Sequence, residues 1–295
     1  MTRQGRAYAY ALTTVLLWST IASAFKITLS YLEPIQLLLY AGSVSTLLLA
    51  GILVVQGKFG QIFCCTPRQY LMSLFLGFLN PFLYYLVLLQ AYQLLPAQQA
   101  QPLNYTWAIT LALLSVPLLG QRMRLAELGA LLLSYAGVVI IATEGQPFSL
   151  HFTDGTGVAL ALVSTIIWAF YWIFNTRDTR DPVVALLVNF LCSFPFVLGY
   201  CLICSELVWP PLPGLFGAIY IGFFEMGACF VLWLLALRYA ENTARISSLI
   251  FLSPFVSLFF IHFLVGEEIL PATYAGLVLI VGGLLWQKRL GKRNS

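Results

Sequence analysis

The chain has 295 residues, of which 60% are hydrophobic and only 9% are charged. Soluble proteins carry about 25% charged residues, so this chain cannot cover a water-facing surface and must fold in a lipid bilayer. Its net charge of +4 could attract an acidic partner, but the positions of the basic residues favour a role in membrane orientation, and we expect no nucleic-acid partner.

Long apolar stretches follow one another along the chain. A helix needs roughly 20 apolar residues to cross about 30 Å of hydrocarbon, and the stretches are continuous rather than alternating, which excludes a closed barrel. We therefore expect an all-α integral membrane protein with ten transmembrane helices, at 8–30, 34–56, 69–93, 97–119, 125–143, 156–175, 182–204, 213–237, 243–265 and 271–288.

Almost all basic residues fall in segments that these spans place on one side of the membrane. Only Lys26 lies elsewhere, near the outer end of the first span. By the positive-inside rule, both termini are cytoplasmic and the protein is a multi-pass protein of the inner membrane. The inner residues are Arg3, Arg6, Lys58, Arg68, Arg122, Arg124, Arg177, Arg180, Arg238, Arg245, Lys288, Arg289, Lys292 and Arg293.

The two halves of the sequence repeat one pattern. Leu76–Leu79 (LGFL) corresponds to Ile221–Phe224 (IGFF), Gly137 to Gly283, and Trp18 to Trp168. We place the units at 1–146 and 147–295, with the boundary in the outer loop. Each unit has five spans, an odd number, so the two insert in opposite orientations, as inverted repeats of secondary transporters do.

The basic start of the chain allows a second interpretation. Met1–Arg6 precedes an apolar run, and Ala22-Ser23-Ala24 resembles a signal-peptidase site. The run is long enough to span, however, and cleavage would remove Trp18 from the first unit. We therefore interpret it as the first span.

Polar residues interrupt the third and fourth spans. Asn80-Pro81 produces either a simple kink or a kink at a cavity. In the fourth span, Gln98, Gln101 and Tyr105 share one helical face, with Gln99 and Asn104 beside it. Such a face must point into the bundle or toward water.

Glu225 is the sharpest candidate for a functional residue. It lies within the eighth span, at the position that corresponds to Asn80 in the first unit. A charged group at this depth costs about 2.5–3.5 kcal/mol, so it indicates function by default. Glu225 could bind a substrate amine or carry a proton; the alternative is a structural carboxyl bonded to a neighbouring helix.

Aromatic residues at mid-depth form a second set of candidates. Such rings suit a cavity wall that stacks on flat or cationic ligands, although each could also be packing. The set is Trp18, Tyr84, Trp107, Trp168 and Tyr171.

Catalytic and metal-binding patterns are missing. The two histidines, His151 and His262, are far apart in sequence, and Cys201-x-x-Cys204 has no second pair to complete a metal site. We expect no enzymatic activity, no catalytic residue, no cofactor and no metal.

Motifs of the second half resemble a known repeat. Pro254 lies within an apolar run, Leu264-Val265-Gly266-Glu267 follows, and Gly276 and Gly283 lie in the last span. These residues resemble the EamA-type repeat of the drug/metabolite transporter superfamily, over nearly the whole chain. The first half departs from it, because Gln121 stands where a glutamate is expected. The resemblance suggests a structural cap or loop tie for Glu267.

The resemblance implies a secondary transporter that works by alternating access. Phosphorylated substrates of this superfamily need Arg or Lys in the cavity, and only Lys26 and Arg245 are available here. The length and aromatic content are similar to those of bacterial aromatic amino acid exporters. We therefore expect export of aromatic and other apolar amino acids with broad selectivity; the rivals are efflux of lipophilic cations or other small metabolites, and a non-transporting scaffold or sensor.

The substrate site is expected near the midplane, between spans 1, 3, 4, 6, 8 and 9. Its partners would be an amino acid and the bilayer, with the chain acting as a monomer or weak homodimer. The expected substrate-binding residues are Trp18, Asn80, Tyr84, Gln101, Asn104, Tyr105, Trp107, Trp168, Tyr171 and Glu225.

The charge asymmetry predicts the topology directly. Cysteines introduced at Asp154 and at Arg180 should react with a membrane-impermeant maleimide from opposite faces, the one at Asp154 from outside. Intact cells and inverted vesicles give the two readouts. Labelling of both positions from the same side contradicts the inverted arrangement.

Overall fold

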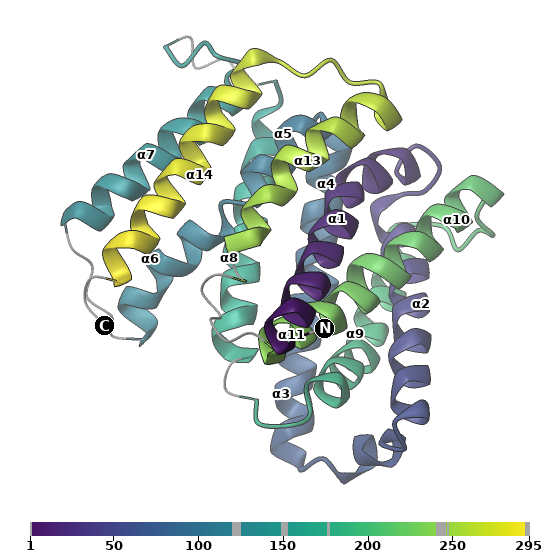
Figure 1. Ribbon diagram of the computed structural model, residues 1–295. Coiled ribbons are helices and arrows are strands. Elements are labelled where there is room, and N and C mark those ends of the chain that lie inside the picture. Colours follow the sequence, from purple (N-terminus) through teal and green to yellow (C-terminus); the bar gives the residue numbers. More distant parts are fainter. Residues whose placement is uncertain are drawn as a thin grey trace.

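The computed structural model describes residues 2–119, 125–148, 153–175, 178–239, 246 and 248–292. Within these ranges the regular structure is entirely helical, without strands (Figure 1). Gln121, His151 and several basic residues that were expected on the inner side (Arg122, Arg124, Arg177, Arg245 and Arg293) lie outside the described residues.

The first half of the chain runs from α1 to α7. A short 3-10 helix, η1, links the second and third helices, and a π-helical segment, η2, lies between α3 and α4. The elements are α1 (Arg3–Thr28), α2 (Pro34–Val55), η1 (Phe59–Cys64), α3 (Pro67–Gly77), η2 (Phe78–Leu83), α4 (Tyr84–Leu94), α5 (Ala97–Asn104), α6 (Trp107–Leu119) and α7 (Leu125–Ala142).

The second half repeats this order. The π-helical segment η3 interrupts its third helix. Its fourth helix begins with the 3-10 helix η4 and ends with the π-helical segment η5. The elements are α8 (Gly155–Asn175), α9 (Pro182–Cys204), α10 (Leu212–Tyr220), η3 (Ile221–Ala228), α11 (Cys229–Tyr239), η4 (Ser248–Leu252), α13 (Ser253–Phe260), η5 (Ile261–Val265) and α14 (Pro271–Lys292).

Six helical stretches of the described chain are long and apolar enough to cross a membrane. They are Arg3–Thr28, Pro34–Val55, Pro67–Leu94, Gly155–Asn175, Pro182–Cys204 and Leu212–Trp233. The chain is therefore an all-helical membrane protein. The other apolar helices, such as Gly129–Ala142 and Pro271–Trp286, are shorter, so the number of ten spans stays a prediction.

The fourth expected span is not one continuous helix. It divides into α5 and α6 at Tyr105 and Thr106. Pro102 inside α5 lacks an N–H to continue the helical bonds, and the Thr106 hydroxyl donates to the Leu103 carbonyl at 2.7 Å. A side chain that bonds to a nearby carbonyl in this way bends a helix. The polar part of the span is thus a separate short helix.

The two halves exchange helices. α1 packs on α11 and α13 of the second half, while α8 packs on α4 and α6 of the first half. Likewise, α2 packs on α10 and η3, and α9 packs on α3 and η2. Each half therefore supplies its first two helices to cover the third and fourth helices of the other.

This exchange produces two bundles of mixed origin. Bundle 1 contains α1, α2, α10, η3, α11 and α13; bundle 2 contains α3, η2, α4, α5, α6, α8 and α9. The main contact between the bundles is α2 against α9. α7 and α14 pair with each other at one side of the molecule (Figure 1).

Glycines permit the closest crossings. A Cβ on Gly77 would overlap the Asn189 carbonyl of α9, and a Cβ on Gly222 would overlap the Ala41 carbonyl of α2. Between α7 and α14, Gly283 lies against Ala130 and Ser134 in the same way. Small residues let helix backbones approach in membranes, where packing replaces the hydrophobic effect.

Adjacent glycines on α14 give a matched test of this packing. Gly283→Val should destabilise the protein by about 1–3 kcal/mol, because overpacking forces the backbones apart. Gly282→Val is the control, since a Cβ at Gly282 meets nothing within 4 Å. The melting temperature in detergent, followed by size-exclusion chromatography, measures both. Equal melting temperatures would contradict the tight crossing.

Candidate functional site

Glu225 lies in the π-helical segment η3 and is half-buried. Its Oε1 accepts a hydrogen bond from the Tyr85 hydroxyl of α4 at 3.1 Å, and the Trp18 side chain of α1 lies near the same carboxyl group. Within the described residues no Lys or Arg forms an ion pair with it. π-helical bulges occur often at functional sites, and this one presents a carboxylate that only neutral donors hold.

Four of the five predicted aromatic residues form one cluster beside Glu225. Trp168 stacks on Tyr84 at 4.5 Å and on Tyr171 at 5.5 Å between ring centroids. Phe230 links Trp168 to Trp18, at 6.2 Å and 6.4 Å. The rings come from α1, α4, α8 and α11, so both bundles contribute.

Trp107 does not join this cluster. It begins α6 and is half-buried, and within the described residues no ring contact connects it to the other aromatic side chains of the cluster. Its position within the fourth span suggested mid-depth, but it lies at the first residue of α6, after the break that divides that span.

Polar residues around the fourth span are held by short side chains of neighbouring helices. Asn104 accepts from the Tyr84 hydroxyl at 3.4 Å and donates to Ser164 at 2.9 Å. The Tyr105 hydroxyl donates to Ser253 of α13 at 2.9 Å. The last bond crosses from bundle 2 to bundle 1.

Gln101 shares the predicted face, and its side-chain amide lies near the Tyr105 hydroxyl of this network. It is 3% exposed, and its Oε1 has no hydrogen-bond partner. A buried acceptor without a partner is costly. Gln101 therefore offers an unused acceptor near the seam between the bundles.

Asn80 occupies the same place in the first half that Glu225 occupies in the second. It lies in η2, where its φ of −149° and ψ of 121° leave the helical region. The Tyr171 hydroxyl lies near the amides of Asn80 and Asn189, but no well-formed bond joins them, and Asn80 Oδ1 and both polar atoms of Asn189 have no partner. Both halves thus place a polar side chain in a π-helical segment.

Two of these residues escaped the sequence analysis. Tyr85 follows Tyr84 in an apolar run, and nothing in the sequence distinguishes it from a packing residue. Its role as a hydrogen-bond donor to Glu225 is visible only in the structure. Asn189 could have been found, because a polar side chain inside the stretch 182–204 carries the same insertion cost that singled out Glu225.

Lys26 and Glu267 lie together at one end of the bundles. Lys26 Nζ donates to the carbonyls of Tyr92 and Leu95 at 2.9 Å and 2.7 Å, so it bonds within the protein instead of reaching the interface. Glu267 accepts from the N–H groups of Ala97 and Gln98 at 2.8 Å and 3.1 Å. It is a helix cap, as its resemblance to the family glutamate suggests.

Ion pairs hold the opposite end. Arg180 pairs with Asp178 and donates to Ser73 at 2.6 Å, and Lys58 pairs with Asp181 at 2.5 Å. Burial acts to raise the pKa of Asp178, but the hydrogen bonds and charge of Arg180 outweigh it and lower that pKa below its usual value. Asp178 is therefore ionised at neutral pH.

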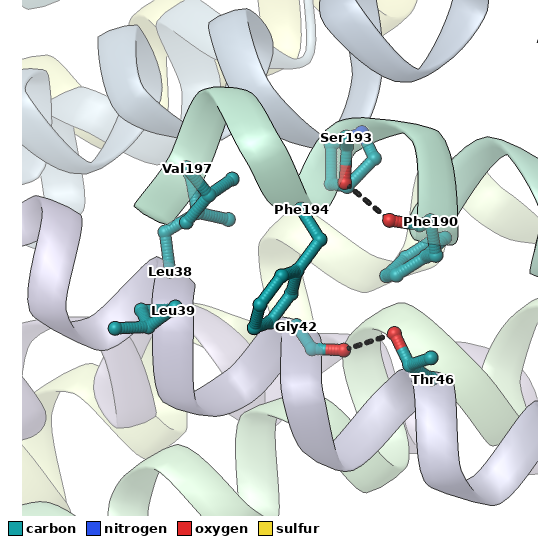
Figure 2. Close-up of a pocket in the computed structure, with 9 residues that line it drawn as sticks. Leu38, Leu39, Gly42, Thr46, Phe190, Ser193, Phe194 and Val197 are labelled. Atoms are coloured by element: carbon teal, nitrogen blue, oxygen red, sulfur yellow. Dashed lines mark hydrogen bonds between the residues drawn. The ribbon is translucent and has the colours of Figure 1, made fainter. Parts of the chain in front are cut away.

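A small pocket lies at the seam between α2 and α9 (Figure 2). Its polar side chains are already used, since Ser193 donates to the Phe190 carbonyl and Thr46 to the Gly42 carbonyl, both at 2.7 Å. No predicted site residue lines it. The other lining residues are Leu38, Leu39, Pro81, Phe194 and Val197.

The EamA-like transporter family matches the chain twice, at residues 5–143 and 155–287. The chain belongs to this family. Its members are transporters, and no catalytic family is indicated. The two matched segments follow the repeat that the sequence displays.

Individual EamA relatives are distant but extensive. An aromatic amino acid exporter, YddG, of Ancylobacter novellus is 25% identical over 231 residues, which cover 75% of this chain and 76% of the relative. An uncharacterised transporter, YvbV, of Bacillus subtilis is 26% identical over 275 residues, covering 90% and 86%.

A solved crystal structure shares the fold of this EamA chain. Its TM-score is 0.69 at 22% identity, and the match covers 98% of this chain and 99% of the other. The arrangement of helices therefore extends to another protein.

Proposed function

We propose that this chain exports amino acids across the cytoplasmic membrane, taking aromatic and other apolar ones with broad selectivity. The observation that carries the proposal is Glu225, a carboxylate that accepts a hydrogen bond from Tyr85 and lies near Trp18, beside a stack of aromatic rings. The name of the Ancylobacter novellus relative points to the same substrate class.

The chemistry of the site suits an amine-bearing substrate. Glu225 and Gln101 Oε1 are acceptors for an ammonium group, whereas the rings of Tyr84, Trp168 and Tyr171 offer stacking surface for a side chain. Neutral donors would take the substrate carboxylate. One methylene changes the affinity of such an apolar wall by only about 1–3 kcal/mol, so discrimination among similar side chains should be modest.

Alternating access would occur at the seam between the bundles. Glu225 and Trp18 belong to bundle 1, whereas the stacked rings belong to bundle 2. The proposal includes ten spans in two inverted units (1–146 and 147–295), cytoplasmic termini, and action as a monomer or weak homodimer. Rocking of one bundle against the other, with α2 and α9 as the hinge, would expose the site to each side in turn.

Efflux of lipophilic cations is the second candidate. It is favoured by one observation: within the described residues Glu225 has neutral donors and aromatic neighbours but no ion pair. Aromatic faces attract cations. Competition by a flat organic cation as strong as that by tryptophan would favour this candidate, and absence of any flux would favour a scaffold.

Glu225→Gln should reduce transport roughly tenfold or more, because a hydrogen bond to a charged group contributes about 1.5–3 kcal/mol. Folding should be retained, since the amide oxygen still accepts from Tyr85. Flux of labelled tryptophan in proteoliposomes, with and without a proton gradient, measures the effect. Unchanged flux across pH would show that the carboxylate is structural.

Trp168→Ala should reduce transport of aromatic amino acids more than that of small ones. It removes a ring on which an aromatic substrate would stack, a contact of about 0.5–1.5 kcal/mol, which corresponds to roughly a two- to tenfold loss. Trp209→Ala is the control, because Trp209 is 82% exposed. Equal loss for large and small substrates would mean that Trp168 only holds the bundle together.

A further inference from the structure

A break between two helices leaves backbone groups to be satisfied at one end of the seam. α4 ends at Leu94 and α5 begins at Ala97. The last carbonyls of one helix and the first N–H groups of the next have no partners within their own helices. Free acceptors and free donors therefore lie side by side around Leu95-Pro96.

Charged side chains from elements packed with bundle 1 bind both sets. Lys26 of α1 donates to the carbonyls of Tyr92 and Leu95. Glu267, which follows η5, accepts from the first N–H groups of α5. A cation at a helix C-terminus and an anion at a helix N-terminus are both favourable to the helix dipoles, and the two charges lie close enough to interact.

Neutral side chains strengthen the same corner. Gln98 donates to the Glu268 carbonyl at 2.7 Å, and its Oε1 accepts from the Leu270 N–H at 2.9 Å and from Thr273 at 3.0 Å. Gln98 of α5 thus caps the start of α14. Gln101, one turn further into the bundle, is almost completely buried.

We infer that Lys26 and Glu267 form a latch that closes the outer end of the transport pathway. This inference rests on the proposed alternating access. Lys26 joins α1 of bundle 1 to the α4–α5 corner of bundle 2, and Glu267 joins to it the segment after η5, which itself packs on α1 and α13 of bundle 1. The bundles therefore cannot separate at this end without breaking all four charged bonds. Water that enters the opened corner would solvate the charges and the freed backbone groups, which makes closed and open two distinct states.

External accessibility of position 101 tests the latch without a substrate. A cysteine is introduced by Gln101→Cys in a Cys204→Ser background. Cys204 is removed because its thiol is exposed and would itself react with the maleimide; it ends α9, beside Ser205, which accepts a hydrogen bond from Gln36 of α2. Intact cells are treated with a membrane-impermeant maleimide. Lys26→Met and Glu267→Gln should each raise the labelling rate at least threefold.

Lys58→Met is the matched control. It removes one cation from an ion pair at the opposite end and should leave external labelling at the parent rate. General loosening is monitored through the native Cys201, which is fully buried, in protein that lacks the introduced cysteine.

The outcomes separate the latch from the proposed function. Labelling at the parent rate in both latch variants, or an equal rise at Cys201, overturns the latch whatever the transport result. A selective rise at position 101 supports it. Absence of flux in the unmodified protein would overturn the proposed function while leaving the accessibility result valid.

Discussion

Hydrocarbon offers no hydrogen-bond partner to a peptide group, so every interrupted helix in a membrane needs partners from within the protein. This chain interrupts its helices at Asn80-Pro81, at Leu95-Pro96 and along η3. Polar side chains gather at each interruption because lipid would leave both the side chain and the backbone unsatisfied. The polar residues of the site and of the α4–α5 corner therefore answer the same need: each set lies where an interrupted helix requires hydrogen-bond partners from within the protein.

The exchange of helices decides where these interruptions meet. Because α1 covers α11 and α8 covers α4, Glu225 of the second half faces two first-half residues, Trp18 of bundle 1 and Tyr85 of bundle 2. Close crossings at Gly77 and Gly222, which correspond in the repeat, hold the third helices against α9 and α2. A larger residue at either glycine would displace the neighbouring π-helical segment, and with it Asn80 or Glu225.

Much of this arrangement could be predicted from local sequence. Apolar runs placed the helices, the repeat related Asn80 to Glu225, and the insertion cost of a carboxylate marked Glu225. The exchange of helices between the halves could not be predicted. Which distant helix a helix packs against produces no periodic pattern of residues in a single sequence. The break before α6 could not be predicted either, because it involves a hydrogen bond from the Thr106 side chain to the Leu103 carbonyl. Trp107 lies just after this break and does not join the ring cluster.

The division of the site between the bundles has a consequence for the proposed mechanism. Bundle 1 supplies the carboxylate of Glu225, and bundle 2 supplies the rings of Tyr84, Trp168 and Tyr171. An amino acid would then bind Glu225 of bundle 1 and Gln101 of bundle 2 through its ammonium group, and the rings of bundle 2 through its side chain, so full binding requires the bundles to approach. Every amino acid carries the same ammonium group, so closure would depend on a contact with Glu225 that all substrates make. The affinity would then vary with the apolar area that each side chain places against the rings. Broad selectivity and coupling of binding to closure would thus follow from the same partition of charge and aromatic surface.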